Sequence, residues 1–371
     1  FQPRQSYEVS ASIPRSYFLG HHHAALSRMR QGIANIGLII ECRDFRVPLT
    51  SWNPLLEQSL ASSPAERARI IVYTKRDLGP DPAAAHGRTQ QAVRHLRDFH
   101  LAPGNPNRAA DVLFLGTGPD HSRALQPLLQ AIKAVARQRD SLTGMRALVV
   151  GMPNAGKSTL LNRLRGRGMG LPKAARTGSE PGVTRRLGTP VRIVLGEGHA
   201  DGEPGMGEGV FVVDTPGVFM PYVSDPEAMM KLALVGSVRD GLVSRVAMAD
   251  YLLYHLNRAG LAPEYMARFN MGRPTNDVHE FLWAVGKRTG KLAKGGEPSL
   301  EAAADWAVQQ WRKGELGRLL MDEVTPERLA RAMEAVRDGN ETLSMNQAVK
   351  KEKVARKARR AAKRLGLGAP E

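Results

Sequence analysis

A loop with the residue pattern of a phosphate-binding site lies near the middle of the chain. Residues 151–158, Gly-Met-Pro-Asn-Ala-Gly-Lys-Ser, match G-x-x-x-x-G-K-[ST] and follow a short apolar run. Backbone N–H groups at the start of the next helix would cradle a β-phosphate. Lys157 would reach the β- and γ-phosphates, and the Ser158 hydroxyl would bind Mg²⁺. The phosphate-binding residues predicted here are Asn154, Ala155, Gly156, Lys157, Ser158 and Thr159.

A second turn supplies the remaining phosphate and metal groups. Asp214-Thr215-Pro216-Gly217 follows the apolar run 210–213. The Asp214 carboxylate would hold Mg²⁺ through water, and the Gly217 amide would meet the γ-phosphate and sense its loss. Thr184, at the end of Pro-Gly-Val-Thr, is the candidate to complete the Mg²⁺ shell and cap the γ-phosphate. A plain surface threonine is the alternative. Catalytic roles are predicted for Lys157, Thr184 and Gly217.

A third motif is typical of guanine recognition. Thr74-Lys75-Arg76-Asp77 fits [NT]-K-x-D at the end of the apolar run 70–73. Asp77 would accept hydrogen bonds from guanine N1–H and the N2 amino group, a donor pair that adenine lacks. Gly116-Thr117-Gly118, after the run 112–115, takes the place of a loop that backs the base. The base-binding residues predicted are Thr74, Lys75, Arg76, Asp77, Gly116 and Thr117.

These motifs end short apolar runs that alternate with helical stretches. The runs cover residues 36–41, 70–73, 112–115, 147–150 and 210–213. This alternation predicts an α/β domain with a largely parallel sheet and ligands at the carboxyl ends of its strands. The Gly-rich stretch 196–209 is predicted to be a loop insertion, and residues 25–33 a short helix. Beyond residue 222 the pattern is helical. The predicted segments are an extension 1–24, the α/β domain 25–222, a helical domain 223–345 and a tail 346–371.

Composition indicates a polyanionic partner. The 371 residues include 53 Lys and Arg against 36 Asp and Glu, a formal net charge of +17. Nucleic acid is the first candidate, and an anionic membrane surface is the second. The single cysteine, Cys42, excludes an internal disulfide framework, and no apolar run approaches the ~18 residues of a spanning helix.

The tail is strongly basic and helical in pattern. Contact with RNA phosphates is the functional interpretation, and a solvated helix face is the alternative. The tail residues predicted to contact RNA are Lys350, Lys351, Lys353, Arg356, Lys357, Arg359, Arg360, Lys363 and Arg364. At the other end, few acids among Arg, Ser and His residues resemble the end of a mitochondrial transit region. His21-His22-His23 is expected to be a polar surface loop rather than a metal site.

The order of the motifs carries a family resemblance. In Ras-like GTPases the phosphate loop opens the domain, whereas here the base motif precedes it and the Asp214 turn comes last. The chain resembles the circularly permuted ribosome-biogenesis GTPases, in particular their bacterial and mitochondrial members. The matching pieces are residues 18–21, 44–48, 74–77, 151–159, 181–184 and 214–217.

The resemblance implies a circularly permuted Ras-like P-loop GTPase domain followed by a mostly α-helical C-terminal domain. It further implies GTP hydrolysis to GDP and phosphate in maturation of the mitochondrial large ribosomal subunit, with the GTP state controlling docking on rRNA. The implied partners are rRNA and proteins of that subunit and other assembly factors. The expected state is a monomer in the mitochondrial matrix, with association at the inner membrane face left open.

Two residues refine the expected chemistry. Val218 stands where Ras-type enzymes carry a water-orienting Gln, so hydrolysis is expected to be slow until the ribosome activates it. Asn154 is similar to the asparagine that binds K⁺ in potassium-stimulated relatives, and a K⁺ there would neutralise developing charge. The alternatives are a permuted GTPase of the nucleolar or cytosolic pathway, an RNA-binding scaffold with negligible hydrolysis, and a P-loop ATPase or kinase.

Overall fold

The computed structural model describes most of the chain. The described residues are 1–10, 13–14, 35–54, 56–57, 67–81, 87–105, 107–118, 124–175, 188–200, 202–218, 223, 225–337 and 350. Four sequence predictions lie outside them: the helix at 25–33, His21-His22-His23, Thr184, and the tail beyond Lys350.

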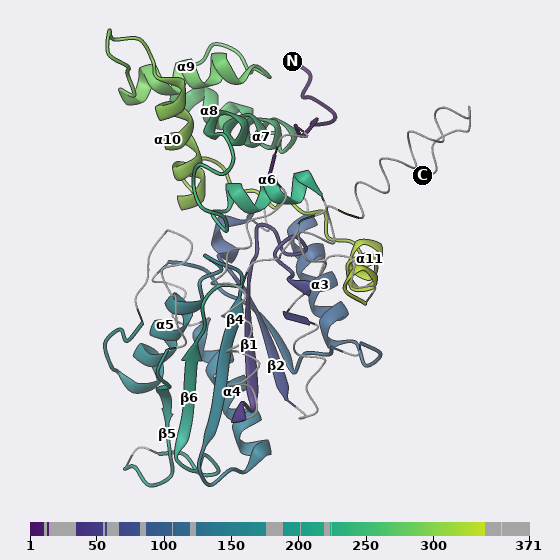
Figure 1. The fold of residues 1–371 in the computed structure, drawn as a ribbon, viewed down its shortest axis with the longest axis vertical. Coiled ribbons are helices and arrows are strands. Elements are labelled where there is room, and N and C mark those ends of the chain that lie inside the picture. Colours follow the sequence, from purple (N-terminus) through teal and green to yellow (C-terminus); the bar gives the residue numbers. More distant parts are fainter. Residues whose placement is uncertain are drawn as a thin grey trace, which may run out of the picture.

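A six-stranded sheet forms the lower part of the molecule in Figure 1. Its strands are β1 (Leu38–Asp44), β2 (Ala68–Thr74), β3 (Asp111–Phe114), β4 (Met145–Gly151), β5 (Val191–Leu195) and β6 (Gly209–Asp214). The strand order is β3-β2-β1-β4-β6-β5, and every neighbouring pair is parallel except β5 and β6. The predicted α/β class with a largely parallel sheet is therefore confirmed.

Alternating residues of the strands face two separate apolar layers. Ile70 and Val72 pack with helices α4 (Leu125–Arg139) and α5 (Lys157–Met169) on one face. Ile71 and Tyr73 pack on the other face with α3 (Arg88–Leu101) and α11 (Pro326–Arg337). Because α11 covers the sheet, it shares a core with the α/β region although it follows the helical stretch in sequence.

Strand β1 is longer than predicted. The apolar run suggested residues 36–41, whereas the strand runs from Leu38 to Asp44. Glu41 and Arg43 both lie inside it, fully buried and paired with each other at 2.7 Å. A buried ion pair interrupts the apolar pattern, so the pattern alone placed the end of the strand too early.

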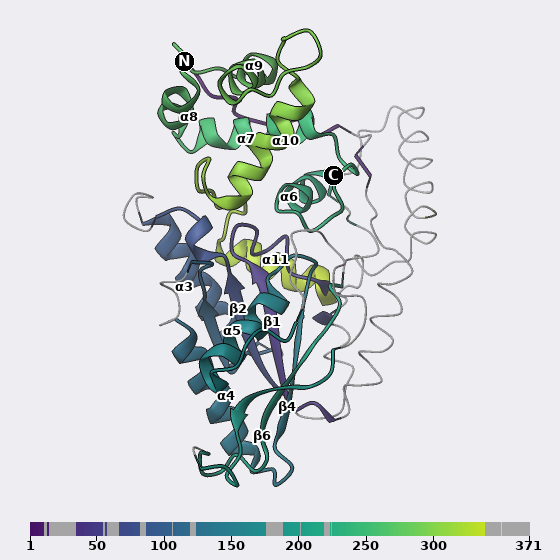
Figure 2. The ribbon, with the colours of Figure 1, turned by 90° about the vertical axis from the view of Figure 1, so that its left-hand side faces the viewer.

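The remaining described α-helices lie above the sheet in Figures 1 and 2. They are α6 (Pro226–Leu234), α7 (Arg245–Arg258), α8 (Ala262–Phe269), α9 (Val278–Thr289) and α10 (Leu300–Lys313). Polar caps begin several of them: Ser244, Asp277 and Ser299 each accept a backbone N–H of the first turn. The helical character predicted beyond residue 222 is confirmed for the described residues. The predicted domain boundaries stay a prediction.

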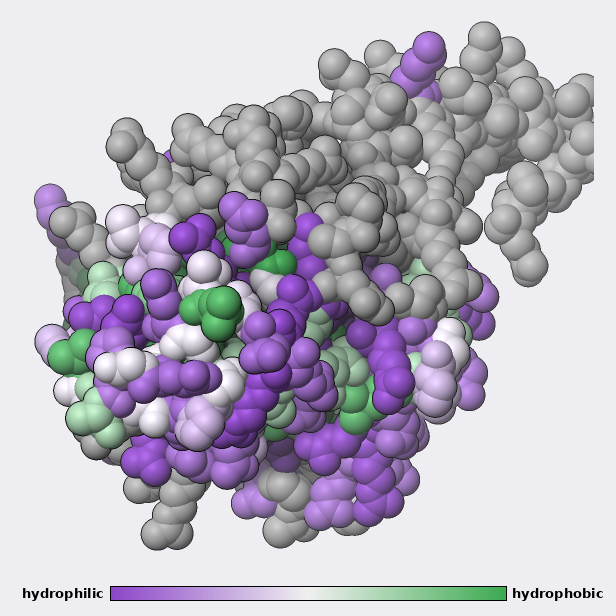
Figure 3. Space-filling view, turned by 90° about the horizontal axis from the view of Figure 1, so that it is seen from below, coloured by the Kyte–Doolittle hydropathy of each residue, from purple (hydrophilic) through white to green (hydrophobic). Residues whose placement is uncertain are grey.

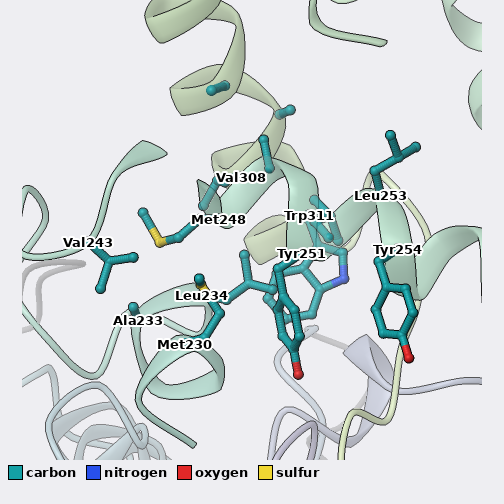
Figure 4. Close-up of a cluster of buried hydrophobic side chains, with 14 of the residues drawn as sticks. Met230, Ala233, Leu234, Val243, Met248, Tyr251, Leu253, Tyr254, Val308 and Trp311 are labelled. Atoms are coloured by element: carbon teal, nitrogen blue, oxygen red, sulfur yellow. The ribbon is translucent and has the colours of Figure 1, made fainter. Parts of the chain in front are cut away.

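One apolar core holds these helices together. Figure 4 shows Met230 and Leu234 of α6 close to Tyr251 of α7 and Trp311 of α10. The N-terminal residues, predicted as an extension, lie along the same region. Arg4 pairs with Asp250 at 2.7 Å, and the Tyr7 ring packs on Tyr251.

The surface opposite the helical region is mainly hydrophilic in Figure 3. The loop between β5 and β6 lies between two antiparallel strands, as predicted for residues 196–209, and its Glu203 binds Arg137 of α4 at 2.8 Å. None of the described helices has the length and apolar character needed to cross a membrane.

Candidate nucleotide-binding site

The phosphate loop connects β4 directly to α5. Gly151, at φ 144°, approaches β1 so closely that a Cβ there would lie 2.3 Å from the Cys42 carbonyl oxygen. Gly156, at φ 86°, immediately precedes the first helical residue, Lys157. Both conformations favour glycine, which explains the two glycines of the motif. The N-terminus of α5 consequently lies at the carboxyl edge of the sheet, where a phosphate would be bound.

Two charged residues define the metal side of the loop. The buried Lys157 donates from Nζ to the Met152 carbonyl oxygen at 2.8 Å, and burial lowers its pKa while Asp214 opposes that shift. Ser158 Oγ donates to Asp214 Oδ2 at 2.5 Å. A hydroxyl and a carboxylate that meet beside the phosphate loop are the oxygen donors that Mg²⁺ prefers. The donor set therefore fits this ion.

The turn after β6 rests on the phosphate loop. A Cβ added to Gly217 would lie 2.6 Å from the Pro153 Cα, so only glycine allows this approach. The Val218 backbone N–H donates to the Gly151 carbonyl at 3.2 Å. From the other side, Asn53 Nδ2 donates to the Val218 carbonyl at 2.8 Å. The Val218 side chain is buried. The turn is thus held between the phosphate loop and the segment that follows β1.

The base motif is bonded to the phosphate loop. Thr74 Oγ1 donates to the Ala155 carbonyl at 2.9 Å, and Lys75 Nζ donates to the Asn154 carbonyl at 2.7 Å. Lys75 has a left-handed backbone, with φ 58°, which turns the chain sharply at the end of β2. These contacts bring together two motifs that lie 79 residues apart in sequence.

Asp77 meets the predicted base loop. Its Oδ1 accepts the Thr117 backbone N–H at 2.8 Å, and its Oδ2 accepts the Thr117 hydroxyl at 2.5 Å. Arg163 of α5 donates to the carbonyl oxygens of Gly116 at 2.6 Å, Thr117, and Gly118 at 3.0 Å. No sequence motif indicated Arg163, because it lies more than forty residues from the loop that it holds. The structure therefore adds a positioning residue to the base side.

Arg163→Gln should accelerate release of a guanine nucleotide. The loss of charge-assisted bonds to three carbonyls loosens the loop that holds Asp77. We expect the dissociation rate of a fluorescent GDP analogue to rise about tenfold, the equivalent of about 1.4 kcal/mol. Arg167→Gln removes an exposed arginine from the same helix and serves as the control. Equal rates for both variants would contradict this role.

The structure brings most of the predicted site residues to one edge of the sheet. The base, phosphate and turn motifs meet there, while Arg76 turns to Phe45, its Cζ 4.6 Å from the ring centroid. Thr184 lies outside the described residues, as do the predicted RNA contacts other than Lys350. Nucleotide binding by these residues stays a prediction.

Comparison with known proteins agrees with this geometry. A family model described as "50S ribosome-binding GTPase" matches residues 146–273. Mitochondrial GTPase 1 of Schizosaccharomyces japonicus is 34% identical over 84% of this chain and 91% of its own length. Mitochondrial ribosome-associated GTPase 1 of Xenopus tropicalis is 29% identical, with 86% and 98% covered. Ribosome biogenesis GTPase A of Bacillus cereus is 26% identical, with 86% and 97% covered.

The fold, the motif order and these relatives lead to one assignment. The base motif ends β2, the phosphate loop follows β4 and the final turn follows β6, which is the order of a permuted GTPase domain. Identity of 34% over 84% of this chain places most of the chain alongside its relative. The chain belongs to the mitochondrial GTPase 1 family of circularly permuted GTPases.

Proposed function

We propose that the chain hydrolyses GTP to GDP and phosphate, and that it acts in maturation of the mitochondrial large ribosomal subunit. One observation carries the enzymatic part of this proposal. The base motif that carries Asp77 is hydrogen-bonded to the phosphate loop through Thr74, and Ser158 at the end of that loop meets the Asp214 carboxylate. The ribosomal and mitochondrial parts are supported by the names of the relatives.

Each residue has a proposed task in hydrolysis. Asp77 selects guanine, Lys157 binds the phosphates, and Ser158, Thr184 and Asp214 hold Mg²⁺. The ion would neutralise negative charge on the β- and γ-phosphates. Gly217 contacts the γ-phosphate with its amide. The buried Val218 has no polar group to orient water, which supports slow hydrolysis until the ribosome supplies one. Asn154 remains the proposed K⁺ ligand.

We further propose that the GTP state controls docking on rRNA. The formal charge of +17 supports a polyanionic partner. The turn that ends at Val218 leads within ten residues into α6, so loss of the γ-phosphate would change how the helical region is held. We place the protein, as a monomer, in the mitochondrial matrix, in contact with rRNA, ribosomal proteins and other assembly factors.

Binding to purified mitochondrial large-subunit particles tests this proposal. We expect the dissociation constant with a non-hydrolysable GTP analogue to be about tenfold lower than with GDP, a coupling of about 1.4 kcal/mol. Lys157→Ala should abolish the difference between the nucleotides, because Lys157 contacts the phosphates. Equal affinity of the wild-type protein for the particles in both nucleotide states would contradict control of docking by GTP.

A further inference from the structure

The end of helix α10 brings two consecutive residues, Trp311 and Arg312, beside the nucleotide motifs. Trp311 is 1% exposed and belongs to the apolar core of the helical region, close to Leu234 and Tyr251 (Figure 4). Arg46, which follows β1, places its guanidinium carbon 4.7 Å from the centroid of the Trp311 ring. This is within the range of a cation–π interaction. The helical region therefore contacts a residue at the carboxyl edge of the sheet.

Arg46 is connected to the base motif through the Asp44 carboxylate. Its Nε and Nη2 donate to Asp44 Oδ1 and Oδ2 at 2.9 and 2.8 Å. Asp44 Oδ2 also accepts Lys75 Nζ at 2.8 Å. Burial opposes ionisation of Asp44, but Arg46 and Lys75 hold the pKa of this carboxyl well below its ordinary value. A fixed, ionised Asp44 thus holds the Lys75 ammonium together with the Asn154 carbonyl.

Arg312 is connected to the phosphate loop separately, through the end of α6 and the residues that follow it. Its Nε donates to the Leu234 carbonyl at 2.9 Å, and its Nη2 donates to the Ala233 carbonyl at 2.8 Å, at the end of α6. Just beyond them, the Gly236 carbonyl accepts Asn154 Nδ2 at 2.6 Å. Gly236 has φ 82°, and a Cβ there would lie 3.4 Å from Arg312 Cζ. The arginine thereby fixes the chain whose carbonyl orients Asn154.

We propose that Trp311 and Arg312 are positioning residues of the nucleotide site. Trp311 acts through Arg46 and Asp44 on Lys75, and Arg312 acts through Gly236 on Asn154. The helical region then helps to set nucleotide affinity. By reciprocity of binding free energies, a nucleotide also biases the placement of α10. This inference rests on the proposed binding of guanine nucleotide, and it adds a route between site and helical region that is separate from the Asp214 turn.

A role in packing alone makes a different prediction. A core tryptophan that only packs would change the free energy of unfolding and leave the affinity of the folded protein unaltered. A positioning role changes the affinity of the folded protein, because Lys75 and Asn154 lose their fixed orientation. Nucleotide affinity below the unfolding transition, with the melting temperature measured alongside, separates the two roles.

The test compares two tryptophans of the same helix. Trp311→Leu should weaken binding of a fluorescent GDP analogue about tenfold, the equivalent of about 1.4 kcal/mol. Trp306→Leu is the matched control, because Trp306 packs instead against Phe269 and Arg268. It should bind within about twofold of wild type. Trp311→Phe keeps a ring beside Arg46 and should retain most of the wild-type affinity for the GDP analogue.

A double-mutant cycle with Asp44→Asn tests the route. With the link to Lys75 already weakened, Trp311→Leu should add less than about a twofold loss. Full additivity, or equal affinities for Trp311→Leu and Trp306→Leu, would overturn the proposal. If Trp311→Leu does not fold, Arg312→Gln is compared with Arg268→Gln instead, with the same tenfold loss expected for Arg312→Gln alone. Failure of the wild-type protein to bind the analogue would instead overturn the proposed function.

Discussion

Asp77→Asn is expected to lower affinity for GDP by about 10²–10⁴-fold and to create affinity for xanthosine diphosphate. A carboxylate can accept bonds from guanine N1–H and N2 in addition to those from Thr117, since its two oxygens offer about four lone-pair directions. Each charge-assisted bond contributes about 1.5–3 kcal/mol, and about 1.4 kcal/mol corresponds to tenfold. Asparagine turns one acceptor into a donor, which suits the C2 carbonyl of xanthine.

Competition binding with GDP and xanthosine diphosphate measures this exchange. Asp98→Asn is the control, because it removes one carboxylate from the exposed surface of α3 without touching the base loop. The amide oxygen of the introduced asparagine can still accept the Thr117 N–H, so the loop should keep its place. Weaker binding of both nucleotides by Asp77→Asn would indicate collapse of the loop and would contradict guanine reading by this carboxylate.

The sequence predicts those parts of the site whose signals are local. The glycines of the motifs indicate backbone conformations or close approaches that only glycine tolerates. The structure has such a conformation or approach at each of them, Gly151, Gly156 and Gly217. Asp77 and Asp214 come at or just after the ends of apolar strands, so their edge of the sheet could be predicted from strand order alone. Local spacing and strand polarity are sufficient for this level of detail.

Contacts between distant segments could not be predicted in this way. Arg163 and Trp311 have ordinary helix neighbours, and nothing near them in sequence indicates their distant contacts, the 116–118 loop and Arg46. The β1 strand shows the same limit, because Glu41 and Arg43 look like the end of a buried run. Only the folded structure brings in the oppositely charged partners that allow Glu41 and Arg43 to be buried. What the sequence lacks is the long-range pairing that makes a polar residue tolerable in a core.

The second large effect that we expect is a loss of stability when a buried cluster of charged residues is disrupted. Glu57 is 1% exposed and accepts bonds from Arg43 at 3.1 Å, from Asn107 at 2.9 Å, and from Arg69 and Trp52. Glu41 pairs with the same two arginines, so two carboxylates balance two guanidinium groups. The cluster joins β1 and β2 to the segment that carries Asn53, whose side chain holds the Val218 carbonyl.

Glu57→Gln should lower the free energy of unfolding by about 3–5 kcal/mol, because it leaves a buried positive charge without its partner. Urea denaturation measures this loss, which is large against a typical total of about 5–15 kcal/mol. Glu203→Gln is the control. Glu203 also binds two basic residues, Lys133 and Arg137, but at the surface, where about 0–1 kcal/mol is expected. Equal losses would show that the cluster is not a buried ion network.

The same cluster should make the wild-type protein sensitive to acid. Burial opposes ionisation of Glu41, yet Arg43 and Arg69 lower its pKa from 4.5 to about 2. A carboxyl whose pKa is lower in the folded state contributes stability above pH 4.5 that disappears as the pH falls toward 2.

Because Asn53 connects this cluster to the turn at Gly217, loosening the cluster by acid or by Glu57→Gln should also reduce discrimination between GDP and a GTP analogue. Nucleotide competition on the folded variant measures that reduction, and unchanged discrimination would confine the cluster to a role in stability.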